Sequence, residues 1–191
     1  TFGRFAMFSL YPTKNMTSGE GGMVACENEA IARKVRLLRN QGMEQRYKNE
    51  VIGFNARMTD VHAAIGRVQL ARLPELTARR QDIARRYTQE LRGVTVPSVA
   101  EGATHVYHQY TVRVPSDRDR FAAALAEDHG VASGVYYPVP THELPSFGLD
   151  LDLPVTRQCA SEVLSLPVYP QLTDDEVDQV IAGVNAVASA G

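Results

Sequence analysis

The stretch FSLYPTKNMTSGEGGM, residues 8–23, decides how the rest of the chain is interpreted. It places one lysine, Lys14, between a Tyr-Pro turn and a Gly-Glu-Gly-Gly bend, inside a hydrophobic segment. A loop lysine is most often a solvated residue without a chemical role, since lysine is rarely buried without a partner. An amine that attacks a carbonyl must instead be unprotonated, and apolar surroundings favour that form. Whether Lys14 can have a chemical role therefore depends on how apolar the segments on either side of the loop are.

Two short apolar segments flank this loop. Residues 4–10 (RFAMFSL) and 22–26 (GMVAC) are bounded by turn-forming residues, which is typical of buried strands in an α/β sheet. A helix is predicted to follow, because Asn28 is a suitable N-cap and apolar residues recur at helical spacing until Gly42. Residues 43–58 show no clear period and predict an irregular loop.

The second half of the chain predicts a long helix followed by a small α+β domain. Thr59 and Asp60 open a helical pattern that continues past Pro74, where we expect a bend because proline interrupts helical hydrogen bonds. A capping box that begins at Thr173 opens the last helix. The other predicted segments are strands over 105–114 and 131–137 and helices over 117–129 and 155–164.

Composition excludes several classes of protein. The 191 residues carry a formal net charge of -2 with a pI near 6.2, so no general attraction to nucleic acid or anionic lipid is expected. Only two cysteines occur, Cys26 and Cys159, which fits a reducing cytoplasm and predicts no disulfide framework. The five histidines have no acidic ligand at metal-binding spacing, so no metal site is predicted, and no apolar run is long enough to span a membrane.

The lysine stretch resembles the lysine segment of the DegT/DnrJ/EryC1/StrS family, which are sugar aminotransferases that use pyridoxal 5'-phosphate (PLP). Five further segments match in the same order, and together the six are distributed along essentially the whole chain. The further segments are RNQGM (39–43), GFNARMTDVHAAIG (53–66), YHQYTVRV (107–114), YYPVPTHELPSF (136–147) and LSLPVYPQLTDDEV (164–177). Six ordered matches are far more specific than any single motif.

The fold that this resemblance implies is the α/β fold of PLP-dependent transferases of the aspartate-aminotransferase type, fold type I, in part. Residues 1–72 would form the end of the large PLP-binding domain, and residues 73–191 the small α+β C-terminal domain with its linking helix. The family's acid at the pyridine nitrogen, its ring-stacking aromatic residue and further phosphate ligands lie upstream of the lysine. The resemblance therefore covers about the C-terminal half of a family member, and we expect the isolated chain, which looks like a fragment, to be inactive.

The resemblance also implies roles for individual residues. Lys14 lies where the family lysine forms a Schiff base with PLP, and Ser9 lies where a serine binds the cofactor phosphate. Asn55 matches an asparagine that reaches the phosphate from the neighbouring subunit, which implies a homodimer with composite active sites. The residues matched to the substrate pocket are Arg57, Tyr11, Tyr136 and His142. The alternatives are a strand-end hydroxyl for Ser9, a turn asparagine for Asn55 and a surface ion pair for Arg57.

The function implied is a cytoplasmic PLP-dependent aminotransferase of amino-sugar biosynthesis. It would transfer an amino group from an amino acid, with L-glutamate as the expected donor, to a nucleotide-linked keto-sugar. Family members that act as sugar dehydratases carry histidine at the lysine position, so Lys14 favours transamination. The alternative is a non-catalytic dimerising or ligand-sensing module of the same fold. The sequence does not specify the sugar, the nucleotide, the ring position or the stereochemistry.

Overall fold

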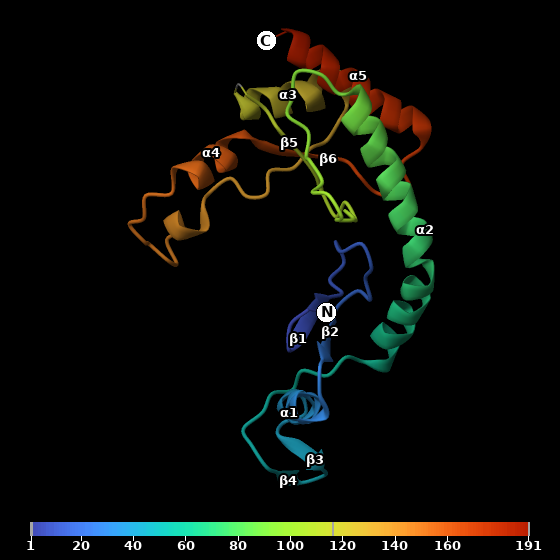
Figure 1. Ribbon diagram of the computed structural model, residues 1–191, viewed down its shortest axis with the longest axis vertical. Helices are drawn as coiled ribbons and strands as arrows, with labels where there is room; N and C mark the ends of the chain where they lie inside the picture. Colours follow the sequence, from blue (N-terminus) through green and yellow to red (C-terminus); the bar gives the residue numbers. More distant parts are fainter. Residues whose placement is uncertain (1, 116, 191) are drawn as a thin grey trace. The chain divides into compact units, whose positions relative to one another are not determined.

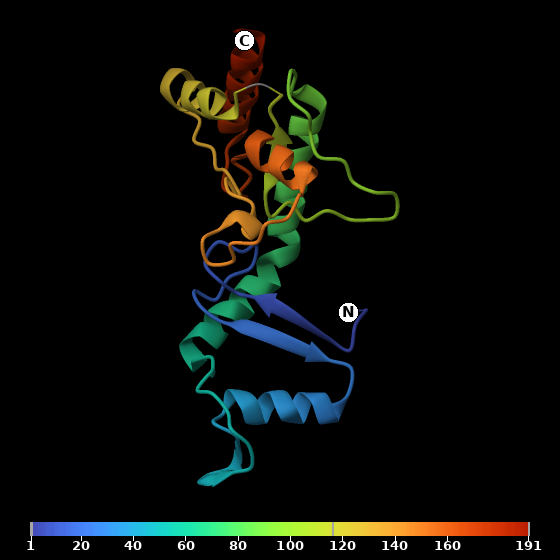
Figure 2. The same ribbon diagram turned by 90° about the vertical axis from the view of Figure 1, so that its left-hand side faces the viewer.

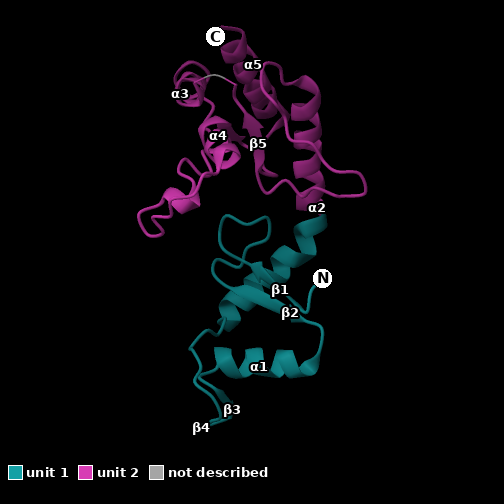
Figure 3. Ribbon diagram, turned by 60° about the vertical axis from the view of Figure 1, so that its left-hand side comes forward, with its two compact units in different colours: residues 1–74 teal, residues 75–191 magenta. Residues whose placement is uncertain are grey.

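The computed structural model describes residues 2–115 and 117–190, and its contacts divide the chain into two compact units. Unit 1 comprises residues 1–74 and unit 2 comprises residues 75–191 (Figure 3). Helix α2 (Asp60–Glu90) contributes to both units and continues through Pro74, so the proline does not end it (Figure 1). None of the helices in these described ranges is long and apolar enough to cross a lipid bilayer.

Unit 1 contains an antiparallel pair of strands, β1 (Phe5–Ser9) and β2 (Gly22–Cys26) (Figure 2). In their register Ser9 lies opposite Gly22. Both strands were predicted, but the prediction that they are buried was wrong for this chain. Side chains on both strands are exposed, namely Phe5, Met7, Phe8, Met23 and Val24. The physical reason is that two strands and one adjacent helix cannot cover both faces of a sheet.

Helix α1 (Glu29–Arg39) follows β2, and its N-cap is the predicted Asn28, whose Oδ1 accepts from the amide of Ile31 at 3.1 Å. The helix ends at Asn40, two residues before Gly42. A short hairpin of β3 (Met43–Gln45) and β4 (Lys48–Asn49) comes next, where the sequence predicted an irregular loop. Strands of two and three residues are too short to show a period of two.

Unit 2 has a two-stranded antiparallel sheet of β5 (Tyr110–Arg113) and β6 (Val163–Leu166). Its helical elements are α3 (Arg118–His129), the 3-10 turn η1 (Thr141–Glu143), α4 (Pro154–Glu162), α5 (Asp174–Ala190) and the second part of α2. They enclose a core whose fully buried side chains include Ile83, Tyr87, Tyr110, Val112, Leu125, Leu164, Val177 and Val184. The α+β character of this part was predicted correctly.

Two helices of unit 2 have ends that are capped by residues next to them in the sequence. Asp117 caps α3 by accepting from the amide of Arg120 at 3.0 Å, and Gly130 ends that helix in the left-handed conformation with φ 66°. The predicted capping box before α5 is confirmed, since Thr173 Oγ1 accepts from the amide of Glu176 and the Glu176 carboxylate accepts from the amide of Thr173.

The predicted strands of unit 2 are shortened. The segment 105–114 contains only the four residues of β5, and the segment 131–137 contributes a single bridge between Gly134 and Ser165. Strand β6 was not predicted, because its first two residues continue the apolar spacing of the preceding helix.

Candidate functional site

The loop that carries Lys14, residues 10–21, is here called the lysine loop. At its base the amide of Leu10 donates to the carbonyl of Gly21 at 2.9 Å. At its tip the amide of Lys14 donates to the carbonyl of Tyr11 at 3.0 Å, which forms a tight turn. The Lys14 side chain is half-buried, so the loop partly shields it from water. These backbone hydrogen bonds therefore fix the position in the loop from which the Lys14 side chain extends.

The first turns of helix α2 pack against the lysine loop through glycines. Ser18 of the loop is fully buried, and a Cβ atom on Gly66 of the helix would lie 3.4 Å from its Cβ. Gly19, with φ +84°, approaches the ring of His62, whose Cδ2 would lie 3.5 Å from a Cβ at that glycine. These contacts, all within unit 1, hold the loop against a regular element.

Ser9 is the last residue of β1 and lies five positions before Lys14. Its Oγ accepts from the amide of Tyr11 at 3.4 Å, which leaves the hydroxyl proton free to donate to another group. The Tyr11 side chain is about half exposed, at 49%. The structure thus brings three of the predicted residues onto one short segment of unit 1.

The structure also brings Asn55 and Arg57 together. Arg57 Nε donates to Asn55 Oδ1 at 3.2 Å, and Arg57 Nη1 donates to the Oδ1 of Asn40 at 3.3 Å. No carboxylate in the described part of the chain forms an ion pair with Arg57, so the surface ion pair considered for this residue is not observed. The guanidinium thus lies beside two amide oxygens.

Tyr136 and His142 belong to unit 2. The Tyr136 side chain is 52% exposed, and its ring lies over Gly134, where an added Cβ would come within 2.7 Å of it. His142, on η1, is only 7% exposed, and its Nε2 lacks a hydrogen-bond partner although Glu143 Oε1 lies 3.5 Å away. Arg157 donates to the same carboxylate oxygen at 2.5 Å, and that bond raises the pKa of Arg157. A buried imidazole nitrogen without a partner is a group that a ligand could satisfy.

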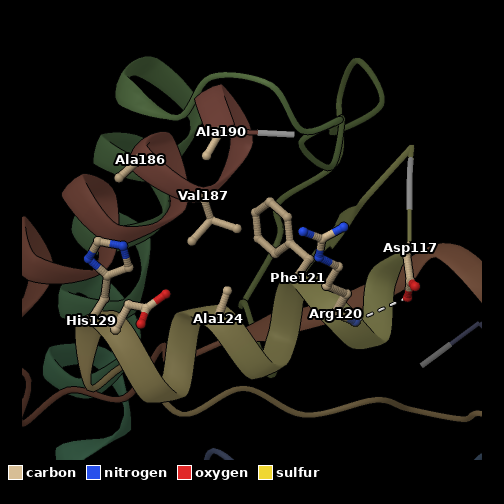
Figure 4. Close-up of a pocket in the computed structure, with 9 residues that line it drawn as sticks. Asp117, Arg120, Phe121, Ala124, His129, Ala186, Val187 and Ala190 are labelled. Atoms are coloured by element: carbon tan, nitrogen blue, oxygen red, sulfur yellow. Dashed lines mark hydrogen bonds between the residues drawn. The ribbon is translucent and has the colours of Figure 1, made fainter.

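A separate hollow of about 490 Å³ lies in unit 2 between α3 and α5. Phe121 and Val187 face one another across it, and Arg120 and His129 lie towards opposite ends of α3 (Figure 4). None of the predicted site residues lines this hollow. It is therefore not the site that the sequence indicated.

The polar groups of unit 1 fit a ligand that carries an aldehyde and a phosphate. Lys14 offers a primary amine, Ser9 a hydroxyl with a free proton and Asn55 an amide, and Arg57 adds a positive charge. Glu20 is the only carboxylate between residues 9 and 26, so little negative charge in this segment opposes an anion. This donor set suits PLP.

The family model described as the DegT/DnrJ/EryC1/StrS aminotransferase family matches residues 1–185. The chain belongs to this family. The DegT/DnrJ/EryC1/StrS resemblance inferred from the six segments is thereby confirmed, and the match runs through both units.

Individual members of the DegT/DnrJ/EryC1/StrS family are similar to the chain. The erythromycin biosynthesis sensory transduction protein EryC1 of Saccharopolyspora erythraea is 40% identical over 96% of this chain and 52% of that protein. The dTDP-3-amino-3,4,6-trideoxy-alpha-D-glucose transaminase of Micromonospora megalomicea subsp. nigra is 37% identical over 95% of the chain and 52% of that protein. The chain spans about half the length of the curated relatives it matches.

A solved structure of NtdA from Bacillus subtilis, with bound cofactor PMP, matches with a TM-score of 0.91 at 30% identity. The match covers 98% of this chain and 46% of that one. The predicted fold class is confirmed: the chain has, in part, the α/β fold of type I PLP-dependent transferases.

The sequence did not single out Asn40, which the structure places against Arg57. Its segment RNQGM was matched to the family, but an asparagine at a helix end is normally only a cap. The contact joins residues 17 positions apart, and no local pattern reports it.

Proposed function

We propose that this chain is the lysine-bearing half of a PLP-dependent aminotransferase. The enzyme transfers an amino group from an amino acid, L-glutamate, to a nucleotide-linked keto-sugar. The observation that carries the proposal is Lys14 on the hydrogen-bonded lysine loop, five residues after the Ser9 hydroxyl. Relatives named as transaminases or synthases of dTDP-, UDP- and GDP-linked amino sugars support the substrate class.

The chain's own residues then have distinct roles. Lys14 would hold the cofactor through its side-chain amine, and the same nitrogen would serve as the group that takes up a proton and returns it during transfer. Ser9 and Asn55 would hold the phosphate by hydrogen bonds. When bound, PLP supplies the electron sink that stabilises negative charge next to the transferred nitrogen. Tyr11, Arg57, Tyr136 and His142 are assigned to the substrates.

The proposal includes a second copy of the protein. Asn55 would reach the phosphate of the neighbouring subunit, so each active site of the homodimer would use both copies. The exposure of Asn55 on the surface of unit 1 is consistent with this assignment. A cytoplasmic location fits substrates that are nucleotide sugars and amino acids.

The test uses the protein that joins this chain to the part corresponding to the other half of its relatives, here called the full-length protein. After incubation with PLP and reduction by borohydride, peptide mapping should find the PLP mass on Lys14. The untreated protein should also convert glutamate to 2-oxoglutarate when a nucleotide-linked keto-sugar is supplied. The Lys14→Arg variant should do neither, and the isolated chain should be inactive.

The result against the proposal is a full-length protein that carries no PLP adduct at Lys14, or a Lys14→Arg variant that still transfers the amine. The first finding would support the alternative of a non-catalytic dimerising or ligand-sensing module, and the second would show that Lys14 is not needed for amine transfer. That alternative is not favoured, because several relatives are named as transaminases and because a module without chemistry has no need of a lysine at this position.

A further inference from the structure

The backbone places Asn40 and Asn55 side by side. The two residues form an isolated antiparallel bridge. The flanking hydrogen bonds run from the amide of Gln41 to the carbonyl of Phe54 at 2.8 Å, and from the amide of Ala56 to the carbonyl of Arg39 at 2.9 Å. Asn40 and Asn55 are thus the non-hydrogen-bonded pair between these bonds, a position in which facing side chains come closest.

Arg57 links the two amides. Its Nε donates to Asn55 Oδ1 and its Nη1 donates to Asn40 Oδ1. A guanidinium has only donors, so the oxygen of each amide, and not its nitrogen, must face Arg57. The orientation of both amide groups therefore follows from the chemistry of the guanidinium.

The two amide nitrogens differ in what they bind. Asn40 Nδ2 donates to the carbonyl of Met43 at 2.9 Å, so both ends of that side chain are held. Asn55 Nδ2 has no acceptor among residues 2–115 and 117–190, and it points away from the guanidinium because its own oxygen points towards it. One amide is an anchor, and the other presents free N–H donors.

We propose that Asn40 is a positioning residue that acts through Arg57 to aim the N–H donors of Asn55 at the phosphate of the cofactor. This inference rests on the proposed function. Without Asn40, Arg57 loses one of its two acceptors and no longer holds the Asn55 amide in one orientation. The guanidinium, which lacks a carboxylate partner within the described ranges, also adds positive charge beside the phosphate donor.

The experiment measures the affinity of the full-length protein for PLP and for pyridoxal, which has the same aldehyde but no phosphate. Asn40→Ala should weaken PLP binding by about three- to tenfold, the loss of one hydrogen bond, and leave pyridoxal binding unchanged. Arg57→Met should have the same selective effect. The matched control is Asn49→Ala, because Asn49 Nδ2 donates to the carbonyl of Gln41 at 2.6 Å but does not contact Arg57.

A double-mutant cycle tests whether Asn40 acts through Asn55. In the Asn55→Ala background, Asn40→Ala should cause no further loss of PLP affinity. The inference is overturned if Asn40→Ala weakens PLP and pyridoxal equally, if the Asn49 control loses as much, or if the effects of the two asparagines simply add. A wild-type protein that does not bind PLP would instead overturn the proposed function, so the two failures are distinguishable.

Discussion

Gly42 and Gly53 cross with their backbones in contact: a Cβ atom on Gly53 would lie 2.3 Å from the amide nitrogen of Gly42. A Cβ on Gly42, whose φ is +78°, would lie 1.7 Å from the carbonyl oxygen of Val51. Both positions need glycine because backbone atoms, which cannot move aside, occupy the space. This crossing holds the segment that carries Asn55 against the end of α1.

Replacing Gly53 by alanine should strongly destabilise unit 1. The added methyl group would meet three backbone atoms at less than 3.0 Å, and we expect a loss of about 3 kcal/mol or more in the free energy of unfolding. Equilibrium unfolding in urea measures this loss of free energy. Gly102→Ala is the control, because an added Cβ there has no neighbour within 4 Å and only its positive φ opposes alanine, which costs about 1 kcal/mol. Equal losses for the two variants would contradict the contact.

Ser9→Ala should weaken PLP binding by about tenfold or more, because a hydrogen bond to a charged group contributes about 1.5–3 kcal/mol. Pyridoxal binding should not change, since it lacks the phosphate. Ser9→Thr keeps the hydroxyl and should remain close to the wild type. Fluorescence titration of the full-length protein gives the dissociation constants. Equal affinity of Ser9→Ala and the wild type for PLP would remove Ser9 from the phosphate site.

Gly134→Ala should alter the position of Tyr136 without affecting the cofactor. The new methyl group would lie 2.7 Å from the Tyr136 ring, so the ring must rotate away. If Tyr136 contacts the sugar nucleotide, the KM for that substrate should rise severalfold while the affinity for PLP stays the same. Steady-state kinetics and PLP titration measure the two quantities. An unchanged KM would exclude Tyr136 from the substrate pocket.

Unit 2 should lose stability between about pH 10 and pH 12. Burial raises the pKa of Tyr110 from 10.0 to about 12. In that range the unfolded chain releases the phenolic proton and the folded chain keeps it, so stability is complete below pH 10 and falls as the pH rises. The shift corresponds to about 2–3 kcal/mol.

Tyr110→Phe should flatten this pH dependence in part, because burial also raises the pKa of Tyr87. The substitution also removes the 2.8 Å hydrogen bond to Thr88, so stability at neutral pH should fall. Tyr47→Phe is the control, since that side chain is 80% exposed. Thermal unfolding at a series of pH values tests the prediction, and an unchanged slope in Tyr110→Phe would contradict it.

Thr173→Ala should destabilise unit 2 by about 1 kcal/mol, the typical contribution of an N-cap. The variant loses the side-chain acceptor for the amide of Glu176 and the hydroxyl contact to its carboxylate. Thr104→Ala, in an exposed loop, should have almost no effect. Differential scanning calorimetry can compare them, and equal melting temperatures for the two variants would argue against the capping box.

What could be predicted from the sequence was mainly local. Helix starts can be predicted from N-cap residues, because each capping hydrogen bond joins residues only three positions apart. The examples are Asn28, Asp117 and Thr173. The residue pattern of β1 and β2 predicted burial, whereas both strands are exposed, because apolar side chains indicate a need for burial but do not say what covers them. Lys14 was indicated by the family motifs around it, whereas the hydrogen-bonded geometry of its loop could not be deduced from composition or spacing.

The part of the candidate site that the sequence missed depends on tertiary contacts. Asn40 and Arg57 meet only because Gly42 reverses the chain and Gly53 lets the returning segment come close. The contact between Asn40 and Arg57 and the approach of Gly53 to Gly42 each join residues more than ten positions apart. Neither helical nor strand periodicity applies over such a separation.

Helix α2 has a thermodynamic consequence for the whole chain. One ladder of backbone hydrogen bonds runs from residues of unit 1 into residues of unit 2, and Pro74 is the position where that ladder lacks a donor. When one unit unfolds, its part of the helix can therefore unwind as far as Pro74 at a small cost in free energy. Unwinding beyond Pro74 would break the helical hydrogen bonds of the other unit. Hydrogen exchange should accordingly register two cooperative blocks of protected amides whose common border falls at the proline.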